Sequence, residues 1–198
     1  MNLHLLELAN AGLESLPDHF GRFIPNARIV NLNFNGLKDL RPLQGIVRLR
    51  RLTAVGNRLT RLRKTASVVA MFSSIVKVDL RDNPLTVGFY PPVTESTVAL
   101  RTIAEGGQVP EAYEACLADA DEDEIYRNRL DSDTKLRRRV YEMLLANGCP
   151  RISMIDGLPV NKAFILRQDD IWSRLVEIGV LRDLRKQSAQ ECDASVDG

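Results

Sequence analysis

The fold is decided by the stretch Val76-Lys77-Val78-Asp79-Leu80-Arg81-Asp82-Asn83-Pro84-Leu85. Together with Ile75 it fills an L-x-x-L-x-L-x-x-N-x-L frame, in which a short strand turns at an asparagine. The same frame recurs three times earlier in the chain, with its anchor position at residues 11, 35 and 57. The anchors at 11, 35, 57 and 83 lie 24, 22 and 26 residues apart, so this part of the chain holds four copies of one structural unit. The frame positions of the three earlier copies are Leu3, Leu6, Leu8, Ala11 and Leu13, then Ala27, Val30, Leu32, Asn35 and Leu37, then Leu49, Leu52, Ala54, Asn57 and Leu59.

Repeats of about 20 to 29 residues with this frame are typical of leucine-rich repeats. Each unit is too small to bury its own apolar edge, so the units must stack into one continuous core. Asparagine is needed where the strand ends, because backbone groups would otherwise be buried unpaired, and Asn35, Asn57 and Asn83 should form a structural ladder. We therefore predict an α/β fold, a right-handed leucine-rich repeat solenoid of about five coils.

The repeat is interrupted after Leu85 by an aromatic and proline-containing segment. We predict a helical insertion before the last coil, with helices over residues 94–105, 110–130 and 133–148, the third burying Leu136, Val140, Met143 and Leu144 on one face. The frame resumes at 150–160, where Ile152 and Met154 should point inward and Gly157 should occupy the anchor. The predicted domains are a solenoid over residues 1–160 including the insertion 87–148, a C-terminal capping helix over 161–186 and a disordered tail over 187–198.

Composition is that of a soluble globular protein, with 44% apolar and 27% charged residues among 198. No apolar run of about 18 residues or signal peptide is present. The three cysteines, Cys116, Cys149 and Cys192, are scattered and odd in number, so we expect free thiols in a reducing compartment. The net charge of +1 gives no general argument for nucleic acid. Because the first repeat starts almost at Met1 without a polar cap, we expect the chain to be a piece of a longer protein.

Catalytic and metal-binding patterns are weak. The histidines, His4 and His19, are far in sequence from every cysteine, and no glycine-rich phosphate loop occurs, so we expect neither an enzyme nor a bound metal or cofactor. The acidic run 119–124 imitates a calcium loop, but Glu124 and Leu130 stand where a glycine and a bidentate glutamate are required, which favours a solvated loop or helix face. A basic set invites a nucleic-acid interpretation, although without interleaved aromatics: Arg137, Arg138 and Arg139, with Arg58, Arg61, Arg63 and Lys64.

Two segments carry a resemblance to known families. Val140-Tyr141 through Cys149-Pro150, followed by Ile155-Asp156-Gly157, resembles the C-terminal cap of SDS22-like leucine-rich repeats. Leu80 through Pro92 is similar to the C-terminal repeat domain of the fungal spindle-pole-body scaffolds of the septation initiation or mitotic exit network, which are related to centriolin.

That resemblance implies a non-enzymatic, cytoplasmic protein–protein interaction module. It would belong to the cytoskeleton at the spindle pole body or centrosome and organise mitotic kinase signalling during the cell cycle, with spindle-pole-body or mitotic-kinase pathway components as partners. The alternatives are a regulatory subunit of a protein phosphatase and an RNA-export-type repeat domain.

The strand residues that face away from the core should line a concave binding surface. Its predicted central row is Glu7, Asn31, Thr53, Asp79 and Ser153; one flank is Leu5, Ile29, Arg51, Lys77 and Arg151; the other is Ala9, Asn33, Val55, Arg81 and Ile155, with Phe34 beside it. Guanidinium groups pair bidentately with phosphate and carboxylate, so Arg51, Lys77, Arg81 and Arg151 could together hold an acidic or phosphorylated peptide. The alternative is a solvated basic face balanced by Asp79 and Asp82.

A secondary binding patch is predicted at Phe89, Tyr90 and Trp172. For the first two, packing over the edge of the solenoid is the competing interpretation. The helix around Trp172 could form a homodimer, although covering the last coil would equally explain its apolar residues.

Overall fold

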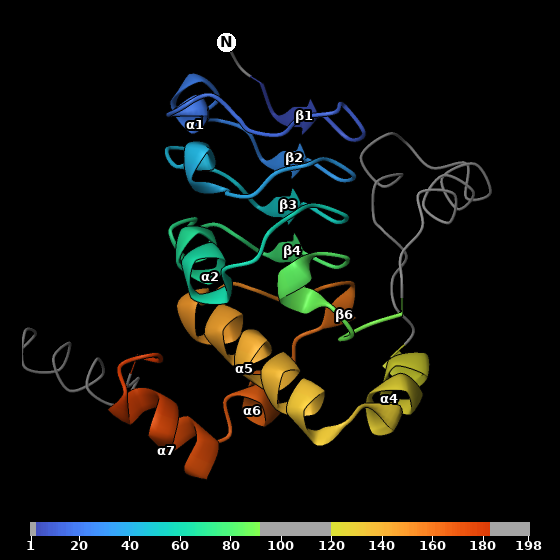
Figure 1. The fold of residues 1–198 in the computed structure, drawn as a ribbon. Helices are drawn as coiled ribbons and strands as arrows, with labels where there is room; N and C mark the ends of the chain where they lie inside the picture. The colour runs from blue at the N-terminus through green and yellow to red at the C-terminus, as the bar shows by residue number, and fades with distance from the viewer. Residues whose placement is uncertain (1–2, 92–119, 183–198) are drawn as a thin grey trace, which may run out of the picture.

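The computed structural model describes residues 3–91 and 120–182, in which six short strands form one sheet in the order of the chain (Figure 1). The first five strands are parallel to one another, and the sixth pairs antiparallel with the fifth. Each of the first four strands comes from one sequence repeat, so the repeat spacing becomes the order of the sheet. The strands are β1 (Leu5–Glu7), β2 (Ile29–Asn31), β3 (Arg51–Thr53), β4 (Lys77–Asp79), β5 (Met154–Ile155) and β6 (Leu158–Pro159).

Strand register brings equivalent residues of successive repeats side by side. Leu5, Ile29, Arg51 and Lys77 form one row of partners, and Glu7, Asn31, Thr53 and Asp79 form another. Between these rows the side chains point the other way, because neighbouring residues of a strand face opposite sides of the sheet. The inward row is fully or nearly fully buried and consists of Val30, Leu52, Val78 and Ile155.

Helical segments stand in a column beside the strands (Figure 1). They are α1 (Phe20–Phe23), the 3₁₀ helix η1 (Arg41–Leu43) and α2 (Leu62–Ala70), while a second 3₁₀ helix, η2 (Pro84–Thr86), follows β4. The core lies between this column and the strands, where Leu37, Leu43 and Leu59 have no exposed surface. Val69 at the end of α2 and Phe72 just after it are buried in the same core.

In the second, third and fourth repeats, an asparagine joins its own unit to the one before. Asn83 Nδ2 donates to Leu80 O at 2.9 Å and to Ala54 O of the preceding unit at 2.8 Å, and Asn83 Oδ1 accepts from Leu59 N at 3.0 Å. Asn57 repeats the pattern one unit earlier, and Asn35 one unit earlier still. These buried amides satisfy backbone groups at the point where the strands end.

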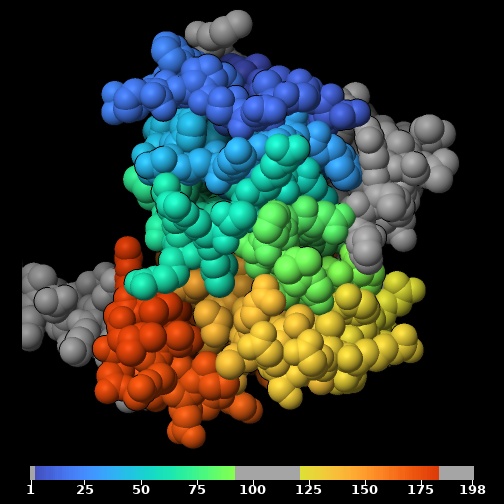
Figure 2. Space-filling view, in the orientation of Figure 1, coloured from blue at the N-terminus to red at the C-terminus, as the bar shows by residue number. Residues whose placement is uncertain are grey.

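The last part of the fold is helical. It comprises α4 (Ala120–Arg129), α5 (Ser132–Gly148), α6 (Lys162–Ile165) and α7 (Asp170–Glu177), with β5 and β6 between α5 and α6. Asp131 caps α5 by accepting a hydrogen bond from Thr134 N at 2.9 Å. Helix α5 packs beside α2 and, together with α6 and α7, covers the end of the stack of repeats, as Figure 2 shows. None of the helices in the described parts of the chain is both long and apolar enough to span a bilayer.

Several boundaries differ from those predicted. The expected helix over 94–105 and the tail over 187–198 lie outside the described residues, and of the helix expected over 110–130 the structure describes only α4. Of the two predicted alternatives, a loop or a helix face, residues 121–124 of the acidic run adopt the helix. In α5 the buried face also differs, since Leu136 is 43% exposed whereas Arg138 is 1% exposed.

The register of the last repeat also differs from the predicted one. Met154 pairs with Lys77, and Ile155 pairs with Val78, so Ile155 is the inward residue and Met154 is not. The reason is a two-residue hairpin turn between β5 and β6, in which Asp156 and Gly157 both adopt positive φ, at 55° and 82°. Ile155 therefore pairs with Val78, a position that the predicted frame gave to Ile152, three residues earlier in the chain.

The predicted capping helix over 161–186 is divided in two. Asn161 caps α6, accepting from Phe164 N at 3.1 Å, and Asp169 caps α7, accepting from Trp172 N at 3.2 Å. Two separate caps create two helix starts, and the intervening residues do not continue either helix. Trp172 and Ile165 pack against Met143 of α5 in a small second core.

Candidate interaction surfaces

The predicted concave face keeps only part of its basic character. Arg51 and Lys77 are half-buried register partners on β3 and β4, as predicted. Arg81, in contrast, is 4% exposed, and its Nη2 donates to Asp79 Oδ2 at 2.7 Å while Nε donates to Asp79 Oδ1 at 3.0 Å. Burial alone would lower the pKa of Arg81, but the Asp79 carboxylate raises it above its usual value. The charge of Arg81 is thus matched within the protein, which corrects its assignment to a peptide-binding cluster.

The centre of the same face is a network of buried polar side chains. Asn31 Oδ1 accepts from Thr53 Oγ1 and from Asn33 N, each at 3.0 Å, and Asn33 Oδ1 accepts from Val55 N at 2.9 Å. Phe34 is half-exposed and has φ of 54°. Its ring lies so close to Gly56 that a Cβ there would come within 2.7 Å of Phe34 Cδ1. Phe34 therefore covers the backbone of the next unit.

Arg151 lies elsewhere than predicted, because the shifted register removes it from the row of Arg51 and Lys77. It lines an open cavity of about 330 Å³ that we call the basic pocket. The other arginines of this pocket were not among the predicted binding residues. Their signal was present, since Arg48 and Arg50 flank the first leucine of the third repeat frame and Arg28 follows the first frame residue of the second. The pocket is lined by Arg28, Arg48, Arg50, Ser74, Val76 and Arg151.

The predicted aromatic patch is not exposed. Phe89, Tyr90 and Trp172 are 0%, 7% and 5% exposed. Phe89 and Tyr90 pack edge to face, with ring centroids 6.4 Å apart, and Phe89 also contacts the ring of Tyr141 on α5. Phe89 and Tyr90 therefore pack over the edge of the stack of repeats, which was the competing interpretation.

Asp156 forms the buried polar centre between the strands and α5. It is fully buried, and its Oδ1 accepts from Leu80 N at 2.7 Å. Asp156 Oδ2 and the hydroxyls of Tyr90 and Tyr141 are buried and have no hydrogen bond of good geometry among the described residues. Burial, together with the negative charge of Asp79, raises the pKa of Asp156 to about 7.

Arg138, in the middle of the run Arg137–Arg139, is not part of a basic surface. Its Nη2 donates to Asp123 at 2.7 Å, its Nε to Glu142 at 3.0 Å and its Nη1 to Phe89 O at 2.9 Å, while its guanidinium lies 4.2 Å from the centre of the Tyr90 ring. This arginine ties α4, α5 and the segment after β4 together. Arg139 pairs with Asp169, and this interaction holds the pKa of Asp169 near 2.

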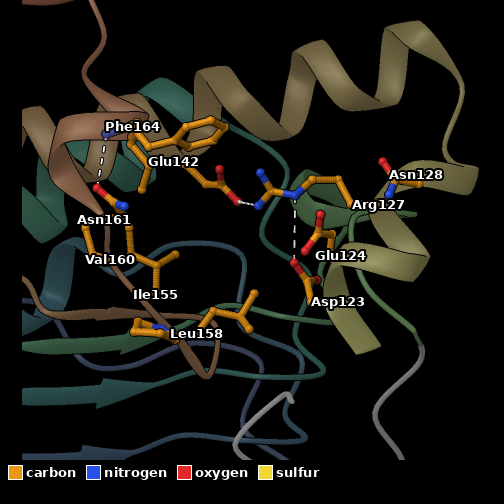
Figure 3. A pocket seen from close by; sticks show the side chains of 12 residues that line it. Asp123, Glu124, Arg127, Asn128, Glu142, Ile155, Leu158, Val160, Asn161 and Phe164 are labelled. Atoms are coloured by element: carbon orange, nitrogen blue, oxygen red, sulfur yellow. Dashed lines mark hydrogen bonds and ion pairs between the residues drawn. The ribbon is translucent and has the colours of Figure 1, made fainter. Parts of the chain in front are cut away.

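A second open cavity, of about 530 Å³, lies among α4, α5, α6 and the β5–β6 hairpin (Figure 3). Arg127 stands within it and reaches Glu142 at 2.9 Å and Asp123 at 3.7 Å. Its apolar wall includes Leu158 and Phe164, the latter 61% exposed. Because Arg127 pairs with two of the acidic side chains, this cavity has no strong charge of one sign.

The described residues offer little for catalysis. Across residues 3–91 and 120–182, no three His, Cys, Asp or Glu side chains gather as a metal site would require. Cys149 is buried, and burial raises the pKa of its thiol to about 12, so it is not a thiolate nucleophile at neutral pH. Cys116 and Cys192 lie outside the described residues.

No family model matches the chain. A scaffold protein matches the chain with 27% identity over 169 residues. It is the septation initiation network scaffold protein cdc11 of Schizosaccharomyces pombe, and the match covers 82% of this chain. The chain spans only 16% of the length of that relative, so the similarity concerns one region of a much larger protein.

Proposed function

We propose that the chain is a leucine-rich repeat solenoid of the SDS22-like class that serves as a non-enzymatic protein–protein interaction module of a scaffold for septation or mitotic-exit signalling. The observation that carries this proposal is the 27% identity to a septation initiation network scaffold across 82% of the chain. At that coverage the similarity extends far beyond a single motif.

The structure supports an interaction role physically. Strands of successive repeats lie in register, so side chains from separate units form continuous rows on a rigid sheet, and such rows suit the recognition of an extended partner. By the same resemblance, the module would act in the cytoplasm at the spindle pole body or centrosome, with protein components of that body or of its kinase pathway as partners.

Affinity purification from dividing fungal cells tests the proposal. The bait is the full chain, beside a variant with Arg51→Glu and Lys77→Glu on the outer face of β3 and β4. The matched control carries the same charge change at Arg58 and Arg63, two exposed arginines outside that row. Retention of spindle-pole or septation-kinase components by the wild type and control supports the proposal. Specific retention of a phosphatase catalytic subunit or of ribonucleoproteins in their place contradicts it and favours one of the alternative functions.

A further inference from the structure

The basic pocket is assembled from four successive repeat units. Arg50 N donates to Arg28 O, Val76 N donates to Arg50 O, and Ser153 N donates to Val76 O, each at 2.8 Å. Residues 28, 50, 76 and 153 are therefore equivalent positions just before strands β2 to β5. The pocket opens where strands β2 to β5 begin, and the last repeat contributes Arg151 to it. The backbone ladder sets the spacing between Arg28 and Arg50.

The four arginines of this pocket differ from those that the fold pairs with carboxylates. Arg81, Arg127, Arg138 and Arg139 each form an ion pair with a carboxylate. Within residues 3–91 and 120–182, no side-chain ion pair or hydrogen bond joins Arg28, Arg48, Arg50 or Arg151 to another residue, and no acidic residue lines the cavity. All four are exposed and line the same cavity, so like charges gather around it. An anion placed among them would relieve this repulsion.

The lining selects the class of anion. Guanidinium groups donate in pairs to the oxygens of phosphate, and a phosphorylated side chain brings about two negative charges and three acceptor oxygens, whereas a carboxylate brings one charge. A cavity of about 330 Å³ accommodates a phosphorylated side chain, and the Ser74 hydroxyl adds a further donor. Val76 in the wall and Val47, 65% exposed and adjacent in sequence to Arg48, add apolar surface beside the charge.

We propose that the basic pocket binds a phosphorylated serine or threonine in a peptide segment of a partner protein. This inference rests on the proposed interaction function and deepens it, because it supplies the chemistry of the partner. The lining contains no aromatic ring on which a base could stack, and the overall charge of +1 does not favour nucleic acid. A peptide is favoured for these reasons.

Fluorescence polarisation with a degenerate library of phosphoserine and phosphothreonine peptides, beside the same library without phosphate, tests the proposal. The wild type should bind the phosphorylated library at least about tenfold more tightly, since hydrogen bonds to charged groups are the strong ones. The variant with Arg48→Glu and Arg151→Glu should lose this preference. The control with Arg58→Glu and Arg63→Glu, which changes the net charge equally, should keep it. A second variant, Arg28→Gln with Arg50→Gln, should weaken binding without reversing any charge, and thermal melting establishes that each protein is folded.

Equal affinity of the wild type for the two libraries overturns the inference. So does a loss of the preference for phosphorylated peptides that is equal in the pocket variant and the control. Preferential binding of a single-stranded RNA oligonucleotide, abolished by the pocket variant, would assign the pocket to nucleic acid and would also overturn it. In the cell, a pocket variant that retains septation-network components as well as the wild type does would contradict the pocket while leaving the proposed function intact. If instead neither protein retains these components but the peptide preference persists, the proposed function fails and the pocket stands.

Discussion

The side chain of Asn83 supplies hydrogen bonds that would otherwise have to come from several backbone groups. Its amide bridges carbonyls of two repeat units and accepts one N–H, all in a site where it is 2% exposed. No water can take over these bonds at such a position, so their loss leaves polar backbone atoms buried and unpaired. The ladder of asparagines thus makes each unit dependent on its neighbour.

We predict that Asn83→Ala lowers the free energy of unfolding by about 2 to 4 kcal/mol, because each buried group left unpaired costs about 1 to 3 kcal/mol. Urea denaturation followed by circular dichroism measures the change. Asn128→Ala is the matched control, since Asn128 is exposed on α4 and the same substitution there should change stability by less than about 0.5 kcal/mol. Equal effects at the two positions would mean that the ladder does not stabilise the stack.

Asp156 gives the fold a dependence on pH. Its pKa is about 7 in the folded protein, against an ordinary value of 3.8, because burial and the nearby Asp79 charge disfavour the ionised form. Between these two values the folded state holds a proton that the unfolded chain has released. Stability from this residue must therefore fall as the pH rises from about 4 to about 7.

Asp156→Asn removes that titration while keeping an oxygen for Leu80 N and a residue type that tolerates the positive φ. Relative to this variant, the wild type should lose stability of the order of 1 to 4 kcal/mol as the pH rises from about 4 to about 7. Urea denaturation of both proteins at a series of pH values measures the difference. A difference that stays constant across the range would show that Asp156 keeps its ordinary pKa in the folded protein.

At the scale of elements, helix α5 is the part that joins the repeats to everything after them. It packs against α2 on one side, contributes Tyr141 and Leu145 to the main core and contributes Met143 to the second core. Its buried Arg138 binds a carboxylate of α4, a carboxylate of its own helix and a carbonyl of the segment after β4. The position of α4 therefore depends on a charged contact as well as on apolar packing.

Arg138→Ala should destabilise the protein by about 3 to 5 kcal/mol, because Asp123 and Glu142 would remain buried with less compensating charge. Chemical denaturation gives the total effect, and limited proteolysis at α4 reports whether that helix detaches first. Arg129→Ala, at an exposed arginine of α4, is the control and should be nearly neutral. A loss below about 1 kcal/mol at Arg138 would contradict a structural role for its ion pairs.

Considered as a whole, the molecule has one large core and one small one. The large core runs without interruption through every repeat and reaches α5, whereas the small core unites α5 with α6 and α7 around Trp172. Local opening requires less free energy where fewer apolar groups are buried. The two cores should therefore open separately.

Native-state hydrogen exchange tests this at the scale of the whole chain. Amides of β2, β3 and β4 should exchange only through global unfolding, while those of α7 should exchange through a smaller opening of lower free energy. Trp172→Ala should increase the difference in opening free energy between α7 and the strands, because it should accelerate exchange in α7 without changing exchange in β3. Uniform protection across both regions would indicate a single cooperative unit.

From the sequence alone followed the features that depend on neighbours along the chain. The period of 22 to 26 residues placed β1 to β4, the two rows of side chains on their outer face and the asparagine ladder. These features are local, because each unit repeats the same alternation and the same turn. The extent of helix α5 was likewise predicted, over 133–148 against the observed Ser132–Gly148, although its buried face was not.

Only the tertiary structure determined which arginines are available to bind a partner. Arg81 and Arg138 look like surface residues in the sequence, but in the folded protein both are buried and paired with carboxylates. One carboxylate partner of Arg138, Asp123, lies on another helix. The turn at Asp156 and Gly157 set the register of the last repeat and thereby removed Arg151 from one surface and placed it in another. A repeat pattern determines the next residue in a row, whereas the pairing of charges depends on segments that meet only when the chain has folded.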